Sequence, residues 1–464
     1  MCTTVIVGKK ASLNGKNIIA RNEDSHETTN PKRFEFVKKA LAKDGIYESY
    51  LTKVKIELPK ESMSYTAMPD VVSDTFNRGR FGEASINEKN VAISSTESLY
   101  GNERVLAYDP LVKDGIAEDA INDILAPYVK TAREAVEMLG RLIEKYGSAE
   151  GNGILFADEE EIWYMEIPTG HHYVAVKLPS DMYGVAPNCV CIEKIDFNDS
   201  ENYIWSNGIQ EFVEKHKLNP DKDTFNFRHI FGTYSELDRV YNTSRAWYAH
   251  RYLDKNFNLG PTAKDIPFLN KADRLISVED VQFILSSHYN ETEFDPIGKG
   301  TEEQKTRFRA ISLSRTQQSH VLEMDEYSIQ WVAFATTAFT PYVPFFVDVN
   351  DTPVEYRDTT FELDMKYAYW LFKVFSYYVE THYGAFSKEN TQYLEDLRAY
   401  GRRRVYEVKE ALKDYNKQNC REFLTEQNEI TAKYVLDKTR KLLNSFMTRA
   451  LSASKMSFTM DENL

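Results

Sequence analysis

The hydrophobic positions of this chain change their spacing along its length. Short apolar runs bounded by turn residues predict strands within residues 54–94, 154–192 and 321–346. Residues 117–146, between the first two of these blocks, instead have apolar positions at helical spacing. A β block, a helical pair and a second β block are typical of a layered α+β domain rather than of a βαβ series.

The helical segments contain their own start and stop signals. Thr131-Ala132-Arg133-Glu134 is a capping box, in which two side chains satisfy backbone N–H groups at a helix start. Gly147 follows the last apolar position and is a typical helix stop. From Glu362 onward the pattern is helical again, and no strong strand signal follows. The C-terminal region is therefore predicted to be helical.

The N-terminal residues predict a tight β-hairpin. Thr3-Thr4-Val5-Ile6-Val7 is β-branched throughout and forms the first strand, and Asn14-Gly15 is a strong turn signal. Residues 16–20 return as the second strand. Antiparallel pairing then brings residues 21–24 back toward the start of the chain. Without a partner at that start, the same charged residues would be an ordinary surface turn.

Cys2 is the candidate nucleophile at that start. Removal of Met1, which a small second residue permits, would leave Cys2 with both a thiol and a free α-amine. An amine with a pKa of about 8 can take the thiol proton at neutral pH, and the thiolate is the reactive form. We expect the guanidinium of Arg21 to favour the thiolate and the carboxylate of Asp24 to hold the terminal ammonium. By position alone, Cys2 would be only the second residue of a chain.

These residues resemble the start of a known family, the N-terminal-nucleophile (Ntn) cysteine dipeptidases. The family is the dipeptidase A type of lactic acid bacteria, related to choloylglycine hydrolase and penicillin V acylase. The matching segments are Cys2-Thr3-Thr4, Gly8, Ala11-Ser12, Arg21-Asn22-Glu23-Asp24, Ser85 to Ser94, Thr96-Glu97-Ser98, Trp331-Val332-Ala333 and Pro341 to Pro344.

The resemblance implies a fold, a reaction and a division of the chain. The fold would be the four-layer αββα sandwich, with residues 1–355 as the catalytic domain and residues 356–464 as a helical extension packed on it. The reaction would be hydrolysis of dipeptides with broad side-chain specificity, through a thioester on Cys2. No metal and no cofactor is expected.

Three further site residues follow from the same resemblance. Asn188 occupies the place of an asparagine that contributes to the oxyanion hole, although it could also be a turn residue after proline. Glu97 falls where the acylases have another oxyanion asparagine. Because a carboxylate donates no hydrogen bond unless it is protonated, Glu97 would instead meet the ammonium of a dipeptide. Arg245 matches a late active-site arginine loosely, and a helix-surface arginine is the alternative.

Two other pairs of residues invite a metal or redox interpretation. Cys189 and Cys191 would lie on alternate positions of a predicted strand over residues 183–192, so their thiols would point to opposite faces. We therefore interpret both as structural cysteines. His171 and His172 diverge for the same reason, and no His/Asp/Glu set has the spacing of metal ligands.

The composition limits which classes of partner and which cell compartment we expect for this protein. The formal net charge of −14 argues against nucleic acid and anionic membranes, and no apolar stretch reaches the length of a membrane span. Four cysteines in 464 residues form no disulfide framework, and no secretory signal precedes the first strand, so a cytoplasmic enzyme is expected. The apolar helical region could build a homo-oligomer. A related N-acyl amide hydrolase and a non-catalytic scaffold remain the alternatives.

Overall fold

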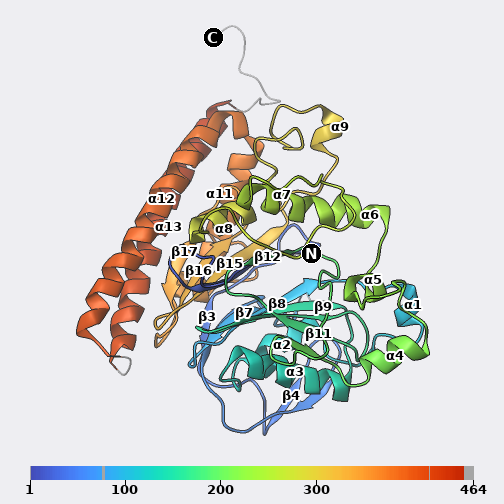
Figure 1. Ribbon diagram of the computed structural model, residues 1–464. Helices are drawn as coiled ribbons and strands as arrows, with labels where there is room; N and C mark the ends of the chain where they lie inside the picture. The colour runs from blue at the N-terminus through green and yellow to red at the C-terminus, as the bar shows by residue number, and fades with distance from the viewer. Residues whose placement is uncertain (1, 76–78, 417–418, 454–464) are drawn as a thin grey trace, which may run out of the picture.

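The computed structural model describes residues 2–75, 79–416 and 419–453, and two antiparallel sheets lie at its centre (Figure 1). The strands of the seven-stranded sheet are, in spatial order, β14 (Leu269–Asn270), β12 (Tyr183–Ala186), β1 (Thr3–Val7), β2 (Asn17–Asp24), β15 (Thr316–Met324), β16 (Ile329–Phe334) and β17 (Val343–Phe346). Those of the eight-stranded sheet are β13 (Tyr203–Trp205), β11 (Val174–Lys177), β10 (Ile162–Ile167), β9 (Asn152–Ala157), β8 (Ala92–Ser98), β7 (Gly82–Asn87), β6 (Tyr65–Pro69) and β3 (Glu35–Val37).

Helices cover the outer face of each sheet. The eight-stranded sheet packs on α2 (Glu118–Leu125) and α3 (Ala132–Tyr146), and the seven-stranded sheet packs on α7 (Ser244–Leu253) and α8 (Val278–Leu285) (Figure 1). One apolar core lies between the sheets, and another lies under each helical layer. The predicted αββα sandwich is therefore confirmed.

The remaining elements are short, apart from three C-terminal helices. The short ones are β4 (Ile46–Glu48), β5 (Lys55–Glu57), α1 (Glu103–Leu106), α4 (Ile209–Lys215), α5 (Phe227–Phe231), α6 (Glu236–Asp238), the π-helical turn η1 (Arg239–Thr243), α9 (Glu302–Lys305), α10 (Val354–Arg357) and the 3₁₀ turn η2 (Leu412–Asp414).

The C-terminal helices are α11 (Ala368–Thr381), α12 (Tyr383–Ala411) and α13 (Cys420–Ala453), as the helical pattern after Glu362 predicted. They lie beside β16 and β17 at one end of the seven-stranded sheet (Figure 1). The Asn428 side chain on α13 bonds both backbone groups of Phe346, accepting from its N–H at 3.0 Å and donating to its carbonyl at 2.8 Å. The edge strand is thus closed to other chains. Within the described residues, none of the helices combines the length and the apolarity that crossing a membrane requires.

The predicted helix signals are present, with one difference. The Thr131 hydroxyl accepts from the Glu134 N–H at 3.1 Å, and α3 ends at Gly147, whose φ of +75° suits glycine. The Glu134 carboxylate, however, accepts from the Lys130 N–H at 2.7 Å rather than from the N-cap residue. The capping box is therefore only half formed.

The strand predicted over residues 183–192 is too long. β12 ends at Ala186, because Pro187 has no N–H for the sheet and starts a turn in which its carbonyl accepts from the Cys189 N–H at 2.7 Å. The buried Glu166 carboxylate then accepts from the N–H groups of Cys191 and Ile192, at 2.6 and 3.1 Å. A side chain thus replaces the strand partner that these residues would need.

Candidate active site

The β1–β2 hairpin places Cys2 between the two sheets. In the register of the hairpin, Thr3 lies opposite Asn22. Extending this register by one residue sets Cys2 opposite Glu23. Side chains alternate along a strand, so Cys2 lies on the same face as Ile6, which belongs to the core between the sheets. The side chain of Cys2 is buried, with 4% of its surface exposed.

The same alternation divides the charged end of β2. Arg21 and Glu23 lie on the face toward the eight-stranded sheet, and Asn22 and Asp24 lie on the helical face. The Asn22 side chain accordingly donates to the carbonyl of Leu285 on α8, at 2.7 Å. Of the four charged or polar residues at this strand end, two therefore lie on the Cys2 face of the hairpin.

Arg21 is a side-chain cation in contact with the thiol. Its Nη1 lies 3.8 Å from Cys2 Sγ, and its Nη2 donates to Glu83 Oε2 at 2.8 Å. Its Nε donates to Ser94 Oγ at 3.2 Å, and Nη2 also donates to the carbonyl of Ser95. Partners on β7 and β8 thus hold the guanidinium in one orientation, with one edge directed at sulfur.

His320 supports this arrangement from β15. Its Nε2 lies 2.7 Å from Ser94 Oγ, the hydroxyl that also accepts from Arg21. Burial, reinforced by the charge of Arg21, lowers the pKa of His320 well below its usual value. The imidazole is therefore neutral at physiological pH and adds no second positive charge beside Arg21. The sequence contained no local signal for this residue.

Asp24 is held from the helical side of the sheet. Its two carboxylate oxygens accept from Arg309 and from Thr316, both far away in the sequence. Asp24 nevertheless lines the same cavity as Cys2. Its position beside the start of the chain agrees with the expected contact to the terminal ammonium, which stays a prediction.

Asn188 and Arg245 meet at the backbone of Cys2. Arg245 is fully buried on α7, and its guanidinium donates to the carbonyl of Cys2, to Thr3 Oγ1 at 2.9 Å and to Asn188 Oδ1 at 2.8 Å. The helix-surface alternative for Arg245 is therefore wrong. The Asn188 Nδ2 donates to the carbonyl of Ser98 at 2.9 Å, which leaves its second hydrogen for another acceptor. The π-helical turn η1 comes directly before α7, and such turns are frequent at functional sites.

The backbone of Glu97 lies in β8, where it pairs with Gly153. Its side chain is outside the described residues, so the proposed role toward a substrate ammonium stays a prediction.

Sequence reasoning missed a group of buried charges beside the thiol. Glu23, Asp70 and Glu83 line one cavity of about 280 Å³ together with Cys2. Lys32, which is completely buried, forms ion pairs with all three carboxylates, the one to Glu83 at 3.9 Å. Glu23 could have been found, because it lies two residues after Arg21 on a strand. The others come from separate segments of the chain.

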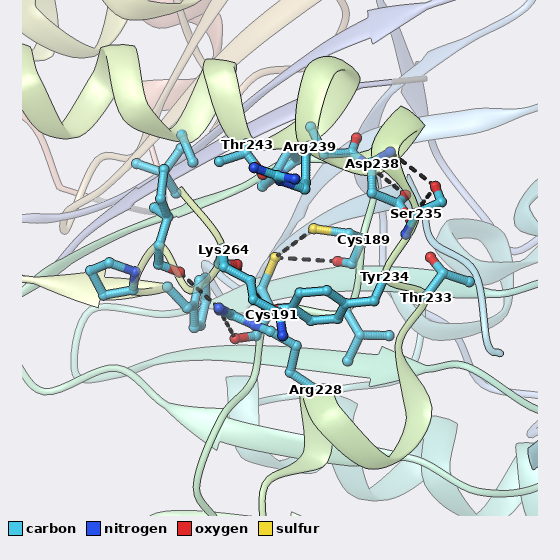
Figure 2. A pocket seen from close by; sticks show the side chains of 18 residues that line it. Cys189, Cys191, Arg228, Thr233, Tyr234, Ser235, Asp238, Arg239, Thr243 and Lys264 are labelled. Atoms are coloured by element: carbon cyan, nitrogen blue, oxygen red, sulfur yellow. Dashed lines mark hydrogen bonds between the residues drawn. The ribbon is translucent and has the colours of Figure 1, made fainter. Parts of the chain in front are cut away.

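Cys189 and Cys191 line a different pocket (Figure 2). Because this segment is a loop and not a strand, their sulfurs converge to 3.7 Å, and the prediction that they point to opposite faces is wrong. Arg228 also lines the pocket, and it donates to the Cys191 carbonyl at 2.6 Å. The neighbouring thiol and burial raise the pKa of Cys191 well above its usual value. Cys191 therefore remains a protonated thiol at neutral pH.

Comparison with known proteins gives a consistent result. The model of Peptidase family C69 matches residues 1–396. A probable dipeptidase of Latilactobacillus sakei is 48% identical, over 100% of this chain and 98% of that protein. Dipeptidase A of Lactobacillus helveticus is 34% identical over 96% of each chain. A crystal structure of a conjugated bile acid hydrolase from Clostridium perfringens covers 72% of this chain and 89% of its own at 10% identity, with a TM-score of 0.28 that is too low to inform the site.

Proposed function

Because this chain belongs to Peptidase family C69, we propose that it hydrolyses the peptide bond of dipeptides, with the Cys2 thiol as nucleophile. The family match and the dipeptidase relatives confirm the resemblance that the opening residues suggested. The observation that carries the assignment of the nucleophile is the Arg21 guanidinium 3.8 Å from Cys2 Sγ, at the wall of a cavity.

In the first step, the thiol of Cys2 loses its proton to the α-amine of the same residue, which removal of Met1 exposes. The resulting thiolate is stabilised by the charge of Arg21. Asp24 holds the α-ammonium. The thiolate attacks the carbonyl carbon of the substrate and forms a tetrahedral intermediate with a negative oxygen.

The second part of the site stabilises that oxygen. The free Nδ2 hydrogen of Asn188 is the side-chain donor, because Arg245 holds Asn188 Oδ1 at 2.8 Å and thereby sets the direction of the amide. Arg245 also holds the carbonyl of Cys2. It is therefore a positioning residue that fixes the nucleophile and the oxyanion donor relative to each other.

The intermediate collapses with loss of the leaving amine. The α-ammonium of Cys2 gives its proton to that amine, the C–N bond breaks, and a thioester to Cys2 remains. Water, deprotonated by the α-amine, then attacks the thioester. The C–S bond breaks, the acid leaves, and the thiol is restored with its proton.

The test compares two forms of the protein that differ only at the N-terminus. Protein beginning at Cys2 should release free amino acids from alanyl-alanine, measured by chromatography. Protein that retains one extra residue before Cys2 should fold equally well and be inactive, because the amine is then an amide. Equal activity of both forms would exclude the α-amine as base. Failure of the first form to hydrolyse any of a panel of dipeptides, with hydrolysis of N-acyl amides instead, would overturn the dipeptidase assignment.

We further propose that residues 356–464 form a helical extension through which the enzyme assembles into a homo-oligomer. The supporting feature is a groove along α12 and α13, in which the rings of Tyr400 and Tyr434 stack with their centroids 3.9 Å apart. A second copy of this chain would cover these rings. Light scattering should give a mass above that of one chain, and Tyr434→Glu should reduce that mass. A monomer at micromolar concentration would contradict this.

We place the enzyme in the cytoplasm. Four cysteines in 464 residues are too few for a disulfide framework, which suits a reducing compartment. A reactive Cys2 thiol must also remain reduced. Fractionation of cells that produce the protein should recover it with cytoplasmic markers, and recovery outside the cell would contradict the assignment.

A further inference from the structure

The wall of the Cys2 cavity is strongly acidic and only partly neutralised. One oxygen each from Glu23, Asp70 and Glu83 lies within 4.8 Å of the others, and all three residues are buried. Two cations, Lys32 and Arg21, adjoin them. When the thiol of Cys2 ionises, its α-amine becomes an ammonium, so three carboxyl groups and a thiolate face three positive charges, and the cavity favours a further cation.

A second observation on this wall points to a hydrogen-bond donor as ligand. Asn30 lines the cavity and is 5% exposed, yet its Oδ1 has no hydrogen-bond partner. The orientation of this amide is determined by its neighbour, because Nδ2 donates to Asp70 Oδ2 at 2.9 Å and only a donor can face that carboxylate. A buried acceptor without a protein donor is costly unless water or a ligand satisfies it, and a ligand with N–H donors can do so.

The distance to the nucleophile identifies which substrate group would fit. In an N-terminal residue, a single Cα separates the α-ammonium nitrogen from the scissile carbon, a span of about 2.5 Å. The ammonium must therefore bind directly beside the nucleophile. Glu23 meets this requirement, because it lies opposite Cys2 in the extended hairpin register and such pairs have Cβ atoms about 5 Å apart. Glu83 is separated from the thiol by only the guanidinium of Arg21.

We propose that Glu23, Glu83 and Asn30 Oδ1 form the subsite for the α-ammonium group of the substrate. This assignment rests on the proposed function, because it concerns the same cavity. The ammonium has three N–H donors for these three acceptors, and it supplies the missing positive charge. Lys32 forms ion pairs with Asp70 and Glu23 and thereby holds Glu23 in place.

Two properties of the three carboxyl groups favour an ammonium as the ligand. Burial raises the pKa of both Glu23 and Glu83, so their ionised forms lack stabilisation in the empty cavity and would gain it from a bound ammonium. A divalent metal fits less well, because the Lys32 ammonium beside all three carboxylates repels a double positive charge more strongly than the single charge of an ammonium.

The test measures binding without turnover, by calorimetry on the Cys2→Ala variant. Alanyl-alanine should bind at least ~100-fold more tightly than propionyl-alanine, which has the same amide and carboxylate but lacks the amine, because a site built for donors rejects a ligand without them. Equal affinities would overturn the subsite. Turnover by the unmodified enzyme is measured in parallel, so that loss of the proposed function and loss of the subsite are distinguished.

Side-chain variants in the same Cys2→Ala background locate the subsite. Glu23→Gln should weaken alanyl-alanine binding by ~10-fold or more and leave propionyl-alanine unchanged. Glu27→Gln is the matched control, since it removes the same charge from an exposed residue lining the same cavity, and it should change both affinities less than about twofold.

Asn30→Ser should act in the same direction as Glu23→Gln, so one variant that fails to fold does not decide the result. An unchanged preference in both variants would overturn the assignment. So would Mn²⁺ binding that depends on Glu23 and competes with alanyl-alanine.

Discussion

Two buried cysteines of this chain, Cys2 and Cys191, have almost the same exposed fraction and opposite surroundings. They are 4% and 3% exposed. Cys2 Sγ has the Arg21 guanidinium at 3.8 Å, whereas Cys191 Sγ has the Cys189 sulfur at 3.7 Å and donates to the Cys189 carbonyl at 3.2 Å. Burial alone favours the neutral thiol. The difference is therefore made by a cation directed at one sulfur.

An arginine lies close to Cys191 as well, which sharpens the comparison. Arg228 donates to the carbonyls of Cys191 and Ile266, at 2.6 and 2.8 Å (Figure 2). Its hydrogen bonds thus organise the backbone around the pocket. Arg21 binds carbonyls too, but also directs Nη1 at the thiol. The presence of an arginine near a cysteine is consequently a weak predictor of reactivity, and the direction of its N–H groups is a better one.

The largest expected effect separates the two thiols directly. Cys2→Ala should lower kcat by ~10⁴-fold or more, because it removes the thiol that attacks the substrate. Cys191→Ala should retain kcat within about threefold and lower Tm by a few degrees, since it removes buried volume. Hydrolysis of alanyl-alanine measures kcat, and thermal unfolding measures Tm, for each variant. A comparable loss of kcat in Cys191→Ala would refute the distinction.

A smaller loss is expected when the oxyanion donor is removed. Asn188→Ala should reduce kcat by ~10²-fold, the usual cost of one such donor, with little change in KM. Asn198→Ala is the control, because Asn198 is an exposed asparagine in a turn further along the chain, and the kcat of this variant should be unchanged. Steady-state kinetics measure kcat and KM separately. A raised KM with an unchanged kcat would assign Asn188 to substrate binding instead.

Alkylation compares the two thiols in the same molecule. At pH 7, iodoacetamide should modify Cys2 ~10²-fold faster than Cys191, because the raised pKa keeps Cys191 protonated. Below its pKa, the thiolate fraction of Cys191 rises about tenfold per pH unit, so its rate should still be increasing at pH 9. Peptide mass spectrometry after digestion gives both rates. A rate at Cys191 that levels off near pH 7 would contradict the environment described.

The smallest effect concerns the two arginines. Arg21→Lys keeps the charge and loses the forked geometry, so kcat should fall by ~10-fold and the acid limb of the kcat/KM profile should shift to higher pH. Arg228→Lys should lower Tm and leave kcat within about twofold. Similar pH profiles for both variants would show that orientation of the guanidinium is unimportant.

The local sequence was sufficient to predict the β1–β2 hairpin on which the site is built. The β-branched run, the Asn14-Gly15 turn and the return strand predicted the hairpin that sets Arg21 beside Cys2. Strand alternation, applied one step further, would also have selected Glu23 rather than Asp24 for the Cys2 face. These features depend on neighbours within one hairpin, and such contacts are determined by turn geometry and period alone.

The sequence by itself therefore determined the hairpin, the helical pair α2 and α3, the helical C-terminal region and the position of the nucleophile at the start of a strand. Only the tertiary structure decided what surrounds that nucleophile. Glu83 comes from the other sheet, Arg245 comes from a helix 243 residues away from the Cys2 carbonyl that it holds, and Cys191 leaves the strand predicted for it. The physical reason is that orientation of a buried charge depends on partners brought together by sheet packing, and no local periodicity encodes them.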